Sequence, residues 1–190
     1  MPIINKDMSL LLQCLASTSL LAELSNADFI NSDYFKLLKF ENEGIKNILV
    51  KSGIGNPAIM QMMLYALLVV PKETLSKSAY KLLDLYVKRL NPSIYRLIET
   101  DGTRSTYNGE SNIKDIDYLR HIRNAVAHSN CKYFSKDGKN LVIFIDKNKH
   151  ASKKCSIKIE CYKVGTILMD LQGLIMDYYS KTYQNAKSIV

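Results

Sequence analysis

The sequence has no tryptophan and few residues that break regular structure, with four prolines and eight glycines among 190 residues. This composition excludes a collagen-like, linker-like or low-complexity chain. Hydrophobic residues make up 47% of the chain and charged residues 23%, so the sequence can bury a core and is not expected to be disordered. Because the length suits one unit and no repeat or linker interrupts it, we expect residues 1–190 to form a single domain.

Cysteine is scarce, and its spacing is not that of a metal site. The four cysteines are Cys14, Cys131, Cys155 and Cys161, with no Cys-x-x-Cys pair and no paired histidines after them. The sequence therefore predicts no metal ligands and no cofactor. Isolated cysteines without a secretion signal are typical of reduced thiols, so we expect a cytoplasmic protein.

Long apolar runs are also missing. The most apolar window, from Ile59 to Val70, is too short to cross a bilayer. We interpret it as a buried helix, and we expect no membrane partner.

Negative charge is in deficit. Lysine and arginine total 26 against 18 aspartates and glutamates, which gives a net charge of +8 and a pI of about 9.2. A basic excess favours polyanionic partners such as RNA, although it also serves plain solubility. Lys149, Lys153 and Lys154 lie in a basic stretch that we interpret as a hairpin tip and a candidate contact with an RNA backbone.

Hydrophobic periodicity predicts a mainly α protein. Apolar residues recur at helical spacing over most of the chain, and the last predicted helix runs from Tyr162 to about Lys187. Gly, Ser, Thr and Asn dominate residues 101–112, which predicts a loop. The pattern becomes strand-like at 140–146 and 155–161. We therefore expect a helical bundle with a β-hairpin, about residues 139–162, inserted before the C-terminal helix.

The most informative segment runs from Tyr118 to Ser129, inside a helix predicted over Ile113–Asn130. At about 100° per residue, one side of this helix is apolar and the opposite arc is almost entirely polar. The apolar side holds Leu119, Ile122 and Val126. In order around the helix, the polar arc consists of Arg123, Ala127, Arg120, Asn124, His128 and His121.

An arc of this composition can support phosphoryl transfer within RNA. Attack by a 2′-hydroxyl on the adjacent phosphate needs a general base, and histidine titrates near neutral pH. Arginine can bind the phosphate oxygens as they gain charge, and asparagine can orient either group. Arg123, Asn124 and His128 are therefore candidate catalytic residues, and Arg120 and His121 are candidate RNA contacts. A solvated helix face with a structural histidine is the ordinary alternative.

The hexapeptide Arg123-Asn-Ala-Val-Ala-His128 resembles the signature of the HEPN superfamily, an arginine followed at short spacing by a histidine. The whole chain is similar to a small bacterial HEPN family found on plasmids and other mobile DNA. The resemblance implies a helical bundle with the motif late in the domain, and a homodimer in which two motifs face each other. It further implies a metal-independent endoribonuclease that acts as a toxin or in phage defence. Arg123 and His128 would be catalytic in such an enzyme, with Asn124 in support.

The resemblance leaves alternatives open. Some HEPN toxins pair with an antitoxin that modifies a tyrosine two residues after the histidine, and this sequence has Asn130 at that position. An antitoxin protein stays a candidate partner. Other HEPN domains have lost catalysis and bind RNA, nucleotides or proteins, which is the alternative function for this chain. A helical interaction protein with no role on nucleic acid is a third interpretation.

Overall fold

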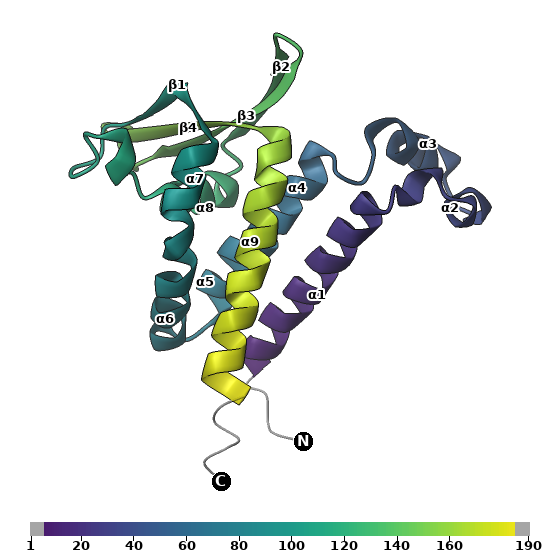
Figure 1. The fold of residues 1–190 in the computed structure, drawn as a ribbon, viewed down its shortest axis with the longest axis horizontal. Coiled ribbons are helices and arrows are strands. Elements are labelled where there is room, and N and C mark those ends of the chain that lie inside the picture. The colour runs from purple at the N-terminus through teal and green to yellow at the C-terminus, as the bar shows by residue number, and fades with distance from the viewer. Residues whose placement is uncertain (1–5, 185–190) are drawn as a thin grey trace.

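The computed structural model describes residues 6–184, most of which lie in helices packed beneath a small antiparallel sheet (Figure 1). The predicted end of the last helix, residues 185–187, lies outside the described residues. In chain order the elements are α1 (Lys6–Asn26), α2 (Asp33–Leu37), α3 (Glu43–Ser52), α4 (Pro57–Leu64), α5 (Val70–Thr74), α6 (Lys77–Val87), α7 (Asn91–Leu97), β1 (Ile98–Ser105), α8 (Tyr118–Ala127), β2 (Cys131–Lys136), β3 (Lys139–Lys147), β4 (Lys154–Glu160) and α9 (Cys161–Tyr179).

The two longest helices, α1 and α9, contact each other within the bundle, and they diverge toward the sheet (Figure 1). Apolar residues at helical spacing bury one stripe of each helix, so that Leu11, Leu171 and Ile175 are fully inaccessible to solvent. The Gln172 side chain donates a hydrogen bond of 3.2 Å to the Thr18 hydroxyl and so joins the two helices. The mainly α class predicted from the sequence is confirmed.

Helix α1 is also long and apolar enough to cross a membrane by length and composition. Its segment Met8–Asn26 has a mean hydropathy of 1.3, and 22% of the tested window is buried. Segments Glu43–Ser52 and Pro57–Thr74 pass the same test only when they are counted together as one span. The chain bends by 88° between these two segments. Core helices of soluble proteins meet this criterion too, so it is weak evidence for a span. The expected lack of a membrane partner stays a prediction.

The four strands form one antiparallel sheet in the order β1-β4-β3-β2. Strands β3 and β4 come from the residues expected to form a hairpin, and they pair with Phe144 opposite Ile157. They are the two middle strands of the sheet rather than an isolated insertion, because β2 pairs with β3 and β1 pairs with β4. Phe144 and Ile157 are buried, and both α8 and α9 pack on these strands. The sheet is therefore a second layer of the main core.

The loop predicted over residues 101–112 is wrong in its first half, because Asp101–Ser105 belong to β1. Strand β1 pairs with β4 from Ile98 opposite Ile159, and the register then shifts between Glu99 and Arg104. Glycine suits this irregular stretch, where Gly102 has a φ of 96°. Pairing with β4, whose Cys155 lies opposite Ser105, outweighs the local turn-forming composition.

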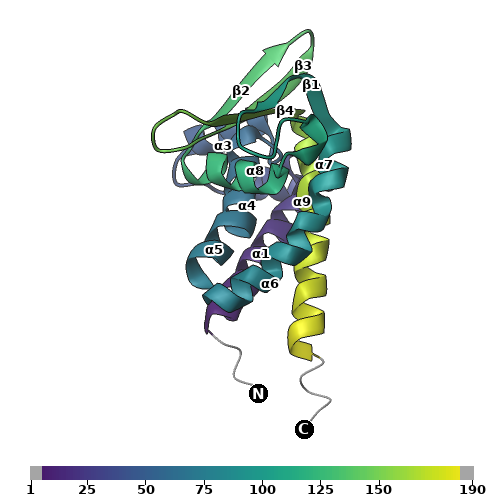
Figure 2. The same ribbon diagram turned by 90° about the vertical axis from the view of Figure 1, so that its left-hand side faces the viewer.

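Helices α2 and α3 extend from the end of α1 and stand apart from the rest of the bundle (Figure 1). Their small core consists of Ile30, Phe35 and Ile54, and α3 itself has no buried residue. This region is remote from α8, which lies directly under the sheet in the second view (Figure 2).

Candidate active site

Helix α8 carries the predicted motif and is shorter than the helix expected over Ile113–Asn130. It begins after Asp117, whose carboxylate accepts a hydrogen bond of 3.3 Å from the Arg120 backbone N–H. The predicted apolar side is confirmed, since Leu119, Ile122 and Val126 are all at most 3% exposed. Because α8 packs on β3, its remaining side chains face the sheet, α6 or solvent according to their place on the helix.

The C-terminal end of α8 is closed by backbone hydrogen bonds at the histidine of the motif. The N–H groups of Ser129 and Asn130 donate to the carbonyls of Val126 and Ala125 at 3.1 and 2.8 Å, and Ser129 has a φ of 52°. This is the Schellman arrangement with serine in the left-handed position that glycine favours. His128 is the last residue before that turn, and it is exposed. Among the described residues, no side chain bonds to its imidazole.

Arg123 points from α8 toward α6. Its guanidinium donates to the Tyr80 hydroxyl and lies 3.6 Å from the Asp84 carboxylate, to which Tyr80 also donates at 3.3 Å. Burial raises the pKa of Tyr80, so its hydroxyl stays protonated at neutral pH. The Arg123 side chain is only 13% exposed, and the cavity beside it measures about 10 Å³, which holds one water at most. In this conformation the guanidinium is fixed in direction but has no room for a nucleotide.

Asn124 connects Arg123 to the sheet. Its side-chain oxygen accepts a hydrogen bond of 3.4 Å from Arg123, and its amide nitrogen donates at 3.1 Å to the Asp146 carboxylate at the end of β3. The Asp146 side chain is 7% exposed. The middle residue of the motif is thus positioned by the strand above it.

His121 does not lie on the exposed arc where the sequence analysis placed it with Asn124 and His128. Its side chain is 1% exposed and turned toward the sheet, with Nδ1 2.6 Å from Asp146 Oδ2 and Nε2 2.7 Å from Glu110 Oε2. The Tyr107 ring packs on it at a centroid distance of 4.8 Å. The imidazole is buried and bonded at both nitrogens, so it is not accessible in the position observed, and the RNA contact expected at His121 stays a prediction.

Arg120, the other predicted phosphate contact, is also engaged. Its guanidinium donates to Glu110 Oε1 at 2.6 Å and lies over the Tyr107 ring, although 36% of the side chain stays exposed. Burial would raise the pKa of Glu110, but hydrogen bonds from Ser105 and His121 and the charge of His121 hold it below the ordinary value. Hydrogen bonds from His121 and Asn124 likewise lower the pKa of Asp146 against the effect of burial. Both carboxyls are therefore ionised at neutral pH.

The predicted basic tip forms the turn between β3 and β4 and includes Lys154, the first residue of β4. Lys149 is exposed, and Lys153 and Lys154 are partly exposed. Among the described residues, no carboxylate forms an ion pair with any of these three lysines. Their charges are therefore available to solvent, unlike that of Arg123.

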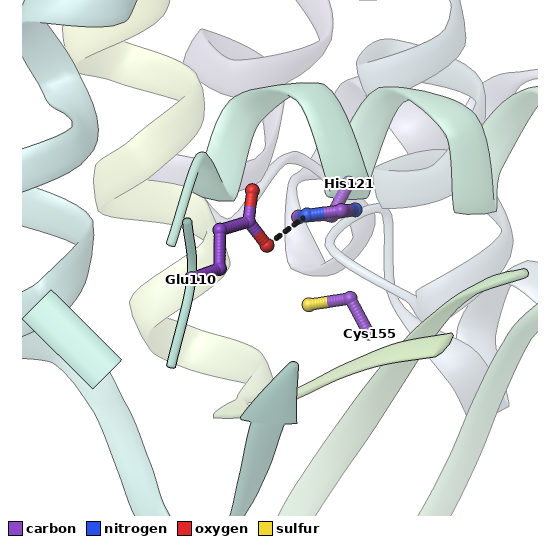
Figure 3. A group of neighbouring side chains, drawn as sticks. All are labelled: Glu110, His121 and Cys155. Atoms are coloured by element: carbon purple, nitrogen blue, oxygen red, sulfur yellow. Dashed lines mark hydrogen bonds and ion pairs between the residues drawn. The ribbon is translucent and has the colours of Figure 1, made fainter. Parts of the chain in front are cut away.

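Three side chains from separate segments form a group with the ligand types of a metal site. Glu110 precedes α8, His121 is on α8 and Cys155 is on β4, and their ligand atoms all lie within 4.8 Å of one another (Figure 3). The search for paired cysteines and histidines in the sequence missed this group because its members are 11 and 34 residues apart. It also gave no reason to select Tyr80, Asp84 or Asp146, since their roles depend on tertiary contacts with α8.

The helical bundle, with its Arg-x4-His motif late in the chain and a closing helix after it, has the arrangement expected of a HEPN-type protein. A family model described as HEPN pEK499 p136 matches residues 5–182. The chain therefore belongs to this HEPN family. No curated protein and no solved structure matches the chain significantly.

Proposed function

We propose that this protein is a metal-independent endoribonuclease that cleaves RNA by 2′-hydroxyl attack, in a site shared by two copies of the chain. The proposal includes a role as a toxin or phage-defence effector, and a cytoplasmic location that suits the four free cysteines. Family membership supports a HEPN-type module, and the arrangement of the motif on α8 supports activity.

One observation carries the proposal: α8 bears both an exposed histidine and an arginine whose direction is fixed. His128 stands at the helix end, open to solvent. Arg123 is held by Tyr80 and Asp84 on one side and by Asn124 on the other. A proton-transfer group and an oriented cation are the two elements that this reaction needs.

In the proposed reaction, the His128 imidazole takes the proton of the 2′-hydroxyl as its oxygen attacks the adjacent phosphorus. The bond from phosphorus to the 5′-oxygen breaks, an imidazolium returns a proton to that oxygen, and a 2′,3′-cyclic phosphate remains. Arg123 binds the phosphate oxygens as their charge increases, exchanging its ion pair with Asp84 for one with phosphate. The hydrogen bond from Arg123 to the Asn124 side chain holds the orientation of the guanidinium during this exchange.

The proposal requires two chains because one chain does not bring the pair together. Positions 123 and 128 are separated by roughly 140° around a helix, and Arg123 is directed at α6 while His128 is at the open end of α8. Two copies of α8 packed across a two-fold axis would place the His128 of each chain toward the phosphate site of the other.

The first test is cleavage of a mixed RNA pool, with and without EDTA, by the wild type and by His128→Ala. We expect the wild type to cut in both conditions and to leave 2′,3′-cyclic ends, and His128→Ala to lose at least about 10²-fold in rate. His150→Ala, which removes an exposed histidine at the β3–β4 turn, is the matched control. Full activity in His128→Ala would exclude the assignment, and cleavage only without EDTA would show that activity depends on a bound metal ion.

The confined Arg123 side chain favours a second candidate function, a HEPN module that binds RNA without cutting it. Here the basic turn of Lys149, Lys153 and Lys154 would carry much of the affinity. We expect alanine at all three positions to reduce the slope of log affinity against log salt by about 2, because each lost phosphate contact removes roughly 0.7 for a single strand. The control is alanine at Lys39, Lys51 and Lys72. These lysines are exposed, and their replacement removes the same total charge. Equal slopes in the two variants would show that the turn makes no specific contact.

A further inference from the structure

The group formed by Glu110, His121 and Cys155 suits a metal ion, although it lies apart from the proposed reaction. Its three side chains are buried, and Figure 3 shows the Cys155 sulfur directed toward the gap between the carboxylate and the imidazole. We propose that Glu110, His121 and Cys155 bind a zinc ion beneath the sheet, with the fourth position of its shell left for water. This inference does not depend on whether the protein is a ribonuclease.

The donor set selects the metal. One thiolate, one imidazole and one carboxylate together suit Zn²⁺, which accepts sulfur, nitrogen and oxygen ligands in one tetrahedral shell. Ligand atoms around zinc are roughly 3.3–3.6 Å apart, as follows from the usual bond lengths. Glu110 and His121 are now hydrogen-bonded at 2.7 Å, so zinc requires these two atoms to separate by less than about 1 Å.

His121 is already oriented as a metal ligand. Asp146 accepts a hydrogen bond of 2.6 Å from Nδ1, which fixes the ring and directs Nε2 toward Glu110 and Cys155. Zinc-binding histidines usually have such a carboxylate on the other ring nitrogen. Glu110 is positioned in the same way by the Ser105 hydroxyl, which donates to Oε2 at 2.6 Å.

The charge of a zinc ion suits the groups of the site. Its two positive charges would offset the Glu110 carboxylate and the Cys155 thiolate that bind it, while Asp146 keeps its hydrogen bond to the imidazole. The Cys155 thiol releases its proton when zinc binds. Burial raises the pKa of Cys155 to about 12, so the thiol ionises only when a cation binds it.

Arg120 is the group that competes with the metal. Its Nη2 lies 3.0 Å from His121 Nε2 and 2.6 Å from Glu110 Oε1, which places a positive charge against two of the three ligands. The side chain is 36% exposed, so it can turn outward when zinc enters. Removing this charge should therefore strengthen zinc binding, whereas removing a ligand should weaken it.

The test is titration of the full-length, untagged protein with Co²⁺, followed by competition with Zn²⁺. A thiolate bound to cobalt gives a charge-transfer band in the near ultraviolet, and tetrahedral cobalt gives strong visible bands. We expect one cobalt per chain with both features, and their loss when zinc is added.

Cys155→Ser should lose the charge-transfer band, whereas the control Cys131→Ser should keep it. Arg120→Gln should bind zinc at least about tenfold more tightly, and Asp146→Asn about 10–100-fold more weakly.

A variant with only one cysteine tests the role of Cys155 even if the Cys155→Ser protein does not fold. Serine at Cys14, Cys131 and Cys161 leaves Cys155 as the single thiol of the chain. Retention of the charge-transfer band in this variant supports the site, and its loss, with the far-ultraviolet circular dichroism unchanged, overturns it. A wild-type protein that shows no such band, or that binds zinc as tightly after Glu110→Gln, also overturns it. None of these readouts involves RNA, so they are unaffected if the proposed ribonuclease fails its own test.

Discussion

Replacing Arg123 by alanine is expected to lower the rate of RNA cleavage by about 10²–10³-fold, the usual effect of removing one oriented donor from a charged transition state. The effect should appear in single-turnover rates at saturating protein, because the interaction proposed for Arg123 strengthens as the phosphate gains charge. Arg96→Ala is the matched control, since Arg96 is an exposed arginine on α7. A rate for Arg123→Ala within about twofold of the wild type would remove Arg123 from the mechanism.

Lysine at position 123 sharpens this experiment, because it keeps the charge and loses the planar donor set. The arginine donates to Tyr80 and approaches Asp84 with Nη1, and it donates to Asn124 with Nη2. A single ammonium group cannot reproduce these directions together. We therefore expect Arg123→Lys to recover little of the lost rate. Full recovery would indicate that the charge alone matters.

The helical part of the fold could be predicted because periodicity records which face of a helix is buried. Leu119, Ile122 and Val126 recur at that spacing, and all three are buried against the core. Strands β3 and β4 were visible for a similar reason, since their residues alternate or form a short apolar run. The β1 stretch 101–105 has a turn-like composition, and only its pairing with β4 makes it a strand.

The surroundings of the motif could not be predicted, because a helical wheel gives the position of each residue around its own helix but not the residues of other elements that contact it. His121 and His128 fell on the same polar arc, yet one is buried between two carboxylates and the other is exposed. The difference arises from Glu110 and Asp146, which come from a loop and a strand outside α8. Carboxylate residues are mostly exposed, so composition alone does not predict that Glu110 and Asp146 are buried against His121.

The second large effect is expected on the stability of the fold, and it arises from the contact between Asp146 and α8. Asp146→Ala is expected to lower the free energy of unfolding by about 3–5 kcal/mol, because it leaves a buried histidine and a partly buried asparagine without their shared acceptor. Urea denaturation, with a chelator present so that bound metal makes no contribution, gives the measurement. The control Asp115→Ala removes an exposed carboxylate and should change stability by less than about 0.5 kcal/mol.

The result also shows whether the sheet positions the residues of the motif. If Asp146→Ala destabilises the fold strongly, β3 holds His121 and Asn124 in place, and the sheet is part of the architecture of the site. A loss near that of Asp115→Ala would mean that α8 is positioned by its apolar face alone. Asp146→Asn separates the charge from the hydrogen bonds, because an amide oxygen can still accept from His121 and Asn124 but carries no negative charge. We expect it to recover part of the stability lost in Asp146→Ala, since the buried imidazole then keeps an acceptor but not its negative partner.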